Sequence, residues 1–351
     1  MENGTCATAV PLFKAQKEDM CTKEVNEAFD RAPSLSTKDI ALTGDEVNHM
    51  QEHMIHTVLR ITVLYGDEGL QKHRGKVLET QPMMHQKIEP HKSELHPLPA
   101  MDINESSTTG NADVISTIMK ELNLPMNKDK LVDTIKLVSG DQLSIAQLRA
   151  VAGERAGNEG GVTVLQWALF VPGLFHYKMA ATHGIIVTHL GLMNQDRRNP
   201  ASLAAHNNIL QCKPIVLTSL PPFQACRDLI FVSLYARVLH CLLLVSKKAS
   251  LQEYSKDLTW EELKEDAGTV VDRFTKTNIV HRLRTEWKQD GDVGGDMVFE
   301  NAVLFLCDSL LLKEFTDSVK CGDSGRVLLV LKVISKKKLV LFLLIPFLPP
   351  K

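Results

Sequence analysis

The hydrophobic positions of this chain follow a helical period over several long segments. From Gly44 onward the composition is that of a helix start, and apolar side chains then recur every three or four residues over 47–61. The same spacing indicates further helices over 113–122, 223–245 and 297–312. Because the segment 223–245 is apolar almost all round, we expect it to be a long helix at the centre of the core.

Two shorter apolar runs have the composition of buried strands. Residues 135–138 form the first run, and Ser144 is predicted to cap the helix that follows, whose apolar positions extend to Val151. The second run, 162–171, ends at a Pro-Gly pair and is again followed by helical spacing. This repeated order of strand, turn and helix predicts an α/β fold that is rich in helices.

The remaining segments divide the chain into three parts. Residues 1–35 show no sustained period and are predicted to form a loosely structured N-terminal arm, while 36–333 form the main domain. Residues 334–351 are an atypical tail of apolar residues and lysines. Within the main domain, 66–99 and 191–209 are predicted to be irregular connections.

Composition narrows the class of protein. The 351 residues are 44% hydrophobic and 23% charged, as in globular proteins. The net charge of −2 gives no overall basic excess that would indicate nucleic-acid binding, although a local basic patch remains an alternative. The seven cysteines form no CxxC pair, and the N-terminus lacks a secretory signal, so we expect an intracellular protein. The last apolar run, 339–348, has about half of the roughly 20 residues that a helix needs to span a bilayer. The sequence therefore indicates no clear membrane partner.

Four residues are candidates for chemistry. Asp141 directly follows the first predicted strand, where the loops of α/β proteins gather ligands and carboxylates. Asp102 follows a short extended segment and could face Asp141 from a neighbouring strand, and Glu300 lies near the first turn of a later helix. His176 opens the helix after the second strand and could orient groups or move protons.

Other interpretations of these residues remain open. An Asp between a strand and a helix is commonly a turn former or a cap, and isolated histidines on apolar helices are commonly buried and satisfied. His49 and His53 are spaced so that both could hold one zinc ion. No carboxylate or thiol is spaced to complete such a site, and a solvated polar face that includes His56 explains all three histidines.

Several motifs show a resemblance to a known family. They are LHPLPAMDINESS at 95–107, SGDQLSIAQLR at 139–149, VPGLFHYKMAATHG at 171–184, LTSLPPFQACRDLIFVSLYARVLHCLLL at 217–244, and GGDMVFENAVLFLCDSL with EFTDSVKCGDSGRVLLVLKV. Over about residues 36 to 333, the chain resembles the fungal, basidiomycete domain-of-unknown-function family 6589. The resemblance implies a transposon-derived ancestry and hence a nuclear location, but no established chemistry. It also implies that this member is truncated at its C-terminus.

Two functions follow as hypotheses. The first is a ribonuclease-H-like core of a metal-dependent nuclease or transposase that acts on DNA. Such a core holds two Mg²⁺ ions about 3.5 to 4 Å apart with carboxylates, for which Asp102, Asp141 and Glu300 are the expected ligands and His176 their neighbour. The second is a noncatalytic domesticated scaffold, in which the same polar residues cap helices and the apolar helices serve packing or association. The two hypotheses differ in whether the three carboxylates converge.

Overall fold

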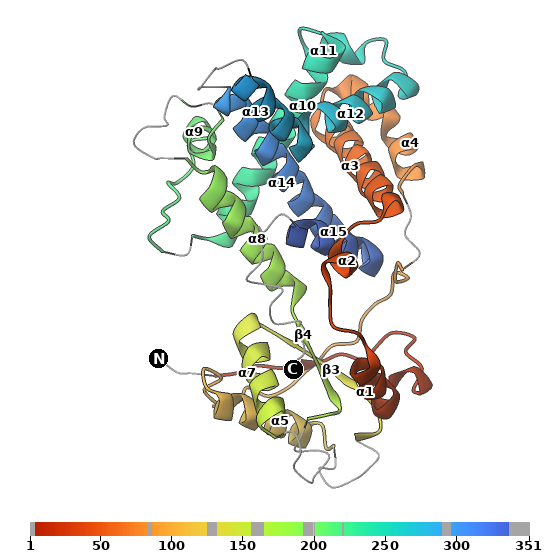
Figure 1. Ribbon diagram of the computed structural model, residues 1–351, viewed down its shortest axis with the longest axis vertical. Coiled ribbons are helices and arrows are strands. Elements are labelled where there is room, and N and C mark those ends of the chain that lie inside the picture. Colours follow the sequence, from red (N-terminus) through yellow and green to blue (C-terminus); the bar gives the residue numbers. More distant parts are fainter. Residues whose placement is uncertain are drawn as a thin grey trace. The chain divides into compact units, whose positions relative to one another are not determined.

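The chain folds into two compact units (Figure 1). The structure is a computed structural model that describes residues 4–82, 86–124, 132–155, 165–191, 199, 201–219, 221–289 and 296–336. Of these, unit 1 contains the residues up to Ser36 and those from Pro90 to Tyr177. Unit 2 contains Thr37–Glu89 and the described residues from Lys178 onward.

The centre of unit 1 is a strand–helix–strand element. Strands β3 (Lys136–Gly140) and β4 (Ala168–Pro172) are parallel, with Lys136 opposite Ala168 and Gly140 opposite Pro172. Helix α7 (Gln142–Glu154) lies between them in sequence, as a parallel connection requires. Both strands predicted from the apolar runs are therefore confirmed. Strand β4 starts at Ala168 within its run, of which 162–164 lie outside the described residues.

An apolar core holds α7 against the strands and against α5 (Thr108–Glu121). Ile145 and Leu148 of α7 are buried with Ile115 of α5, and Trp167 and Phe170 from the β4 segment complete the cluster. At about 25 cal/mol for each Å² of apolar surface removed from water, such a cluster is the main force that holds this sheet and its helices together. The carboxyl edge of the two strands is thereby fixed in position.

The first 35 residues, expected to form a loose arm, contain regular structure. Strand β1 (Thr8–Ala9) pairs with β2 (His96–Pro97) in an antiparallel sheet, and 3-10 helix η1 (Glu18–Met20) precedes helix α1 (Thr22–Arg31). The backbone N–H of Thr22 donates to the carbonyl of Asp133 at 2.9 Å. Contacts with residues about a hundred positions away thus order this segment, and local periodicity does not reveal such contacts.

Unit 2 is a helical assembly. Helix α8 (Leu174–His189) begins at the end of unit 1 and continues into unit 2. The other elements are α2 (Thr37–Ile40), α3 (Gly44–Tyr65), η2 (Glu68–His73), α4 (Arg74–Glu79), α9 (Leu203–Ile209), α10 (Phe223–Ser246), α11 (Leu251–Ser255), α12 (Trp260–Phe274), α13 (Thr277–Gln289), α14 (Met297–Cys321) and α15 (Ser324–Lys336). The prediction that 66–99 and 191–209 are irregular is wrong where η2, α4 and α9 lie, because these helices are too short to show a period.

Four long helices, α3, α10, α12 and α14, pack on one another in unit 2 (Figure 1). Helix α3 starts as expected, because Thr43 and Glu46 form a capping box in which each side chain accepts a hydrogen bond from the other's backbone N–H. Part of the core lies between α8, α10 and α14, where Ile186, Ile230 and Phe305 are fully buried. The predicted central position of the 223–245 helix is confirmed.

Helix α14 is longer than its predicted span of 297–312, because it continues without a break to Cys321. It ends at Gly322, whose φ of +65° is in the left-handed region that favours glycine. The chain then reverses into α15, which packs back on α14 and also contacts α3. Three residues of the predicted tail belong to α15, and the rest of the tail lies outside the described residues.

The predicted helix-rich α/β class is confirmed. The described residues form two sheets of two strands each, and all other regular elements are helices. Among these, α10 is long and apolar enough to cross a membrane by length and composition, a test that the core helices of many proteins also pass. A ribonuclease-H-like core remains a prediction.

Candidate functional site

The carboxyl edge of β3 and β4 brings two of the predicted residues together. Asp141 follows β3 directly, and His176 lies in the first turn of α8, after the turn that ends β4. The backbone N–H of Gly173 donates to the carbonyl of Gly140 at 2.9 Å, which closes the two turns on each other. A Cβ atom on Gly173 would lie 3.3 Å from that carbonyl and 3.4 Å from the His176 ring. The glycine therefore allows this close approach.

Asp141 is held in place by the helix that follows it. Its Oδ1 accepts a hydrogen bond of 2.6 Å from the backbone N–H of Ser144, which makes Asp141 the N-cap of α7. Burial alone would raise the pKa of this carboxyl. Hydrogen bonds from Ser144, with a smaller contribution from the neighbouring His176, outweigh that effect and lower the pKa. The carboxylate is therefore ionised at neutral pH and has the His176 imidazole as a neighbour.

The prediction that Ser144 caps this helix is wrong. The helix starts at Gln142, and Ser144 supplies the N–H that the cap binds. Both Asp and Ser are common N-cap residues, so composition alone does not decide between them. The position of Gly140 at the end of β3 does, because the chain leaves the strand there and Asp141 is next.

Asp102 lies in unit 1 on an exposed loop. It follows Met101, which pairs with Thr5 in an isolated bridge, so the predicted extended segment before the loop is present. The loop is tied to the α7 helix, since the Gln147 side chain donates to the carbonyl of Ser106 at 2.9 Å. Asp102 therefore belongs to the same unit as Asp141 and His176.

Glu300 lies in unit 2, in the first turn of α14. Its side chain is buried, and its Oε2 accepts a hydrogen bond of 2.7 Å from Nε of Arg284 on α13. This ion pair links α13 to α14. Within the described residues, no three His, Cys, Asp or Glu side chains gather as a metal site would require. The convergence of Asp102, Asp141 and Glu300 on Mg²⁺ remains a prediction.

Two of the three histidines of α3 are not on a solvated face, so that interpretation is wrong for His53 and His56, whereas His49 is exposed. His53 is only 2% exposed and His56 only 7%, and Nε2 of His56 lies 2.9 Å from the carbonyl of Val77. Burial and the nearby Arg326 guanidinium lower the pKa of His53 to about 3. Burial also lowers the pKa of His56. Both rings are therefore neutral at physiological pH.

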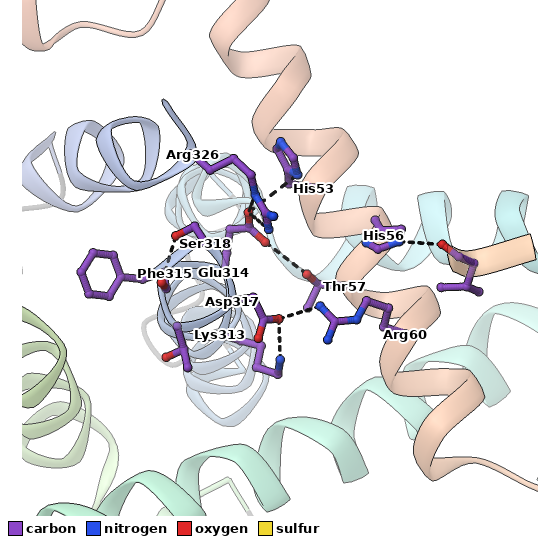
Figure 2. A network of polar contacts seen from close by, with 12 residues as sticks. His53, His56, Thr57, Arg60, Lys313, Glu314, Phe315, Asp317, Ser318 and Arg326 are labelled. Carbon is purple, nitrogen blue, oxygen red and sulfur yellow. Dashed lines mark hydrogen bonds and ion pairs between the residues drawn. The ribbon is translucent and has the colours of Figure 1, made fainter. Parts of the chain in front are cut away.

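Around His53 lies a buried network of polar side chains, drawn in Figure 2. At its centre is Glu314 of α14, 1% exposed, whose Oε1 accepts hydrogen bonds of 2.8 and 2.6 Å from Nε and Nη2 of Arg326 on α15. Thr57 donates to the other oxygen at 3.3 Å, and Nδ1 of His53 lies 3.7 Å from Oε1. Burial raises the pKa of Glu314, and Arg326 counteracts this.

A second buried carboxylate, Asp317, lies one turn further along α14. It accepts hydrogen bonds from Arg60 of α3 at 2.9 Å and from Lys313 at 2.5 Å (Figure 2). The two carboxylates thus join α3, α14 and α15 through charged hydrogen bonds. Sequence reasoning missed this network. The available signal was two acidic residues three apart, directly after the apolar run of α14.

His189, at the C-terminal end of α8, has a buried acidic partner. Its Nε2 lies 3.0 Å from Oδ2 of Asp308, and both side chains are buried between α8 and α14. The ring of Phe305 packs edge-on against the imidazole, with 5.5 Å between ring centroids. This pair therefore contributes to the packing of α8 on α14.

The chain is a helix-rich α/β protein with a polar strand edge in one unit and a buried ion network in the other. It belongs to a family of unknown function, DUF6589, whose model matches residues 29–336. The resemblance found in the sequence motifs is thereby confirmed at the level of the family. No curated protein and no solved structure matches the chain.

Proposed function

We propose that this protein is a nuclease-like or transposase-like domain that acts on DNA at the carboxyl edge of β3 and β4. The observation that supports the proposal is the juxtaposition of Asp141 and His176 on successive strand-to-helix turns. Ligands of α/β proteins bind at such edges, because a rigid sheet holds the loops that approach them. A carboxylate and an imidazole side by side can direct a water molecule at a phosphodiester.

Each of the two residues has a defined role in this proposal. Asp141 is ionised, since its pKa is lowered, and in the proposal it orients the attacking water beside the imidazole. His176 is half-buried beside it and takes the proton from the water as the new P–O bond forms. The same proton then passes to the leaving oxygen as the old P–O bond breaks.

Mg²⁺ fits the donor chemistry of this edge, because the cation prefers oxygen ligands and Asp141 offers an ionised carboxylate. When bound, the cation would stabilise charge on the phosphate and lower the pKa of its water. In the proposal, Asp102, which lies in the same unit as Asp141, supplies a further ligand. Glu300 lies in unit 2 and already pairs with Arg284.

Cleavage of a supercoiled plasmid in the presence of Mg²⁺ tests the proposal. The informative variant is Asp141→Asn, because Asn is as good an N-cap as Asp and leaves α7 intact. We expect this variant and His176→Asn to lose about a hundredfold or more of the activity. Asp133→Asn, at an exposed position shortly before β3, is the matched control and should retain it. Equal cleavage by all variants, or none by the wild type, would contradict the proposal.

The second candidate is a noncatalytic scaffold, and two contacts favour it. The Asp141 carboxylate caps α7, and the Glu300 carboxylate pairs with Arg284, so both side chains already serve the fold. A scaffold shows no cleavage, yet Glu300→Gln should weaken the packing of α13 on α14. Hydrogen exchange of peptides from α13 measures that weakening directly.

The two candidates also differ in where they act. A DNA-cleaving domain implies an intracellular, nuclear protein, whereas a scaffold does not require a nuclear location. Imaging of a fluorescent fusion distinguishes the two, and exclusion from the nucleus would count against the nuclease.

A further inference from the structure

Unit 2 contains a cavity that the proposed function does not use. It lies where the end of α12, the helix α13 and the start of α14 meet, and its volume is about 730 Å³. This volume is in the range of about 300 to 1,000 Å³ found for pockets that bind small molecules. Three cationic side chains, Arg273, Lys276 and Arg282, line it together with two aromatic rings, Phe274 and Phe299.

The lining of the cavity is positively charged. Asp272 is the one carboxylate among its lining residues, and it pairs with Lys276 at 2.5 Å. Arg282 lies 3.6 Å from Glu286, and both of these side chains are more than half exposed, so the pair contributes little and opens readily. Within the part of the chain that the structure describes, Arg273 makes no hydrogen bond or ion pair. Two guanidinium groups are thus available to an anion.

The aromatic rings provide an apolar surface beside these charges. Phe274 and Phe299 pack edge to face, with 6.4 Å between ring centroids and an interplanar angle of 83°. Both side chains are half-buried, so part of each ring remains accessible. A flat heterocycle can stack on such a surface, and this contact is tolerant of the kind of base.

We propose that this cavity binds a nucleotide, with the phosphate on Arg273 and Arg282 and the base against the two phenylalanines. Guanidinium groups suit phosphate because they donate two parallel hydrogen bonds in a fixed plane. The nucleotide is either free or one unit of a single strand, since both present the same phosphate and ring. The proposal does not depend on cleavage, because the cavity and Asp141 belong to different units.

The test is isothermal titration calorimetry of the full chain with AMP, adenosine and inorganic phosphate. We expect AMP to bind more tightly than either of the other two, since only AMP has both groups. Arg273→Gln and Arg282→Gln should each weaken AMP binding by about tenfold or more, because each removes a charged hydrogen bond. Phe299→Leu should weaken AMP binding while leaving phosphate binding unchanged.

Arg74→Gln on α4 is the matched control, since Arg74 is exposed in the same unit and does not line the cavity. Its AMP affinity should equal that of the wild type. A short oligothymidylate distinguishes a free nucleotide from a single strand. If the oligothymidylate binds more tightly than AMP and this binding depends on Arg273, the ligand is a strand. If it binds more weakly than AMP, the ligand is a free nucleotide. Absence of AMP binding at millimolar concentration, or equal binding by the Arg273→Gln/Arg282→Gln double variant, would overturn the proposal.

Discussion

Replacing Arg326 with Met should destabilise the packing of α14 strongly. The substitution removes both hydrogen bonds that Glu314 accepts from the guanidinium, at 2.8 and 2.6 Å, while the carboxylate stays 1% exposed. Its remaining contacts are Thr57 at 3.3 Å and the neutral His53. Removing one partner of a buried ion pair typically costs about 3 to 5 kcal/mol, because the other charge remains without compensation.

Hydrogen exchange measured by mass spectrometry on peptides of α14 is the appropriate assay. Because the chain has two units, a single unfolding curve does not report on one transition. A loss of about 3 kcal/mol corresponds to amide exchange more than about a hundredfold faster in α14. The loss should shrink as the pH falls, since protonation of Glu314 then removes the uncompensated charge.

Two further variants make the prediction specific. In the double variant Glu314→Met/Arg326→Met, both charges are gone and side chains of similar length fill the space, so stability should return to near the wild-type value or exceed it. Lys248→Met removes the exposed partner of Glu253 and should cost less than about 1 kcal/mol. If Arg326→Met behaves like Lys248→Met, or if the double variant is as unstable as the single one, the reasoning is refuted.

Three other perturbations have clear expected results. The pKa of His53 is about 3 in the folded protein and about 6.5 when unfolded, so its contribution is complete above pH 6.5 and falls by about 2 kcal/mol on going to pH 5. Hydrogen exchange of α3 peptides in the wild type and in His53→Leu should show this difference. Asp141→Ala should cost about 1 kcal/mol and speed exchange at the start of α7, whereas Asp141→Asn should not. Gly110→Ala would place a Cβ 1.9 Å from the Asn104 carbonyl, so it should lower stability by about 1 to 3 kcal/mol, measured by hydrogen exchange of α5 peptides, and loosen the loop that carries Asp102.

The elements that sequence predicted well are those whose signals are local. The start of α3 follows from its capping box, and β3 and β4 follow from apolar runs that end at glycine or proline. The same local order placed Asp141 and His176 at one edge, because parallel strands bring their following turns together. Up to this point no knowledge of distant contacts was needed.

The features that escaped prediction depend on contacts between distant residues. His53 and His56 have the spacing of a polar stripe, but α14, α15 and the Val77 carbonyl cover them. Glu314 meets Arg326 only because the chain turns at Gly322, and Thr57 comes from a helix more than 250 positions earlier. The meeting of the three carboxylates is also a long-range property, so spacing alone could not test it.

The reversal at Gly322 sets a practical limit on how far this domain can be shortened. Arg326 is the fifth residue after Cys321, where α14 ends, and it reaches Glu314 only because the chain has turned back. Any fragment that stops at the end of α14 would retain a desolvated carboxylate whose counter-ion has been cut away. Expression boundaries and protease cleavage between 322 and 326 should therefore decide whether unit 2 remains intact, because they separate α14 both from its counter-ion and from the buried side chains of α15.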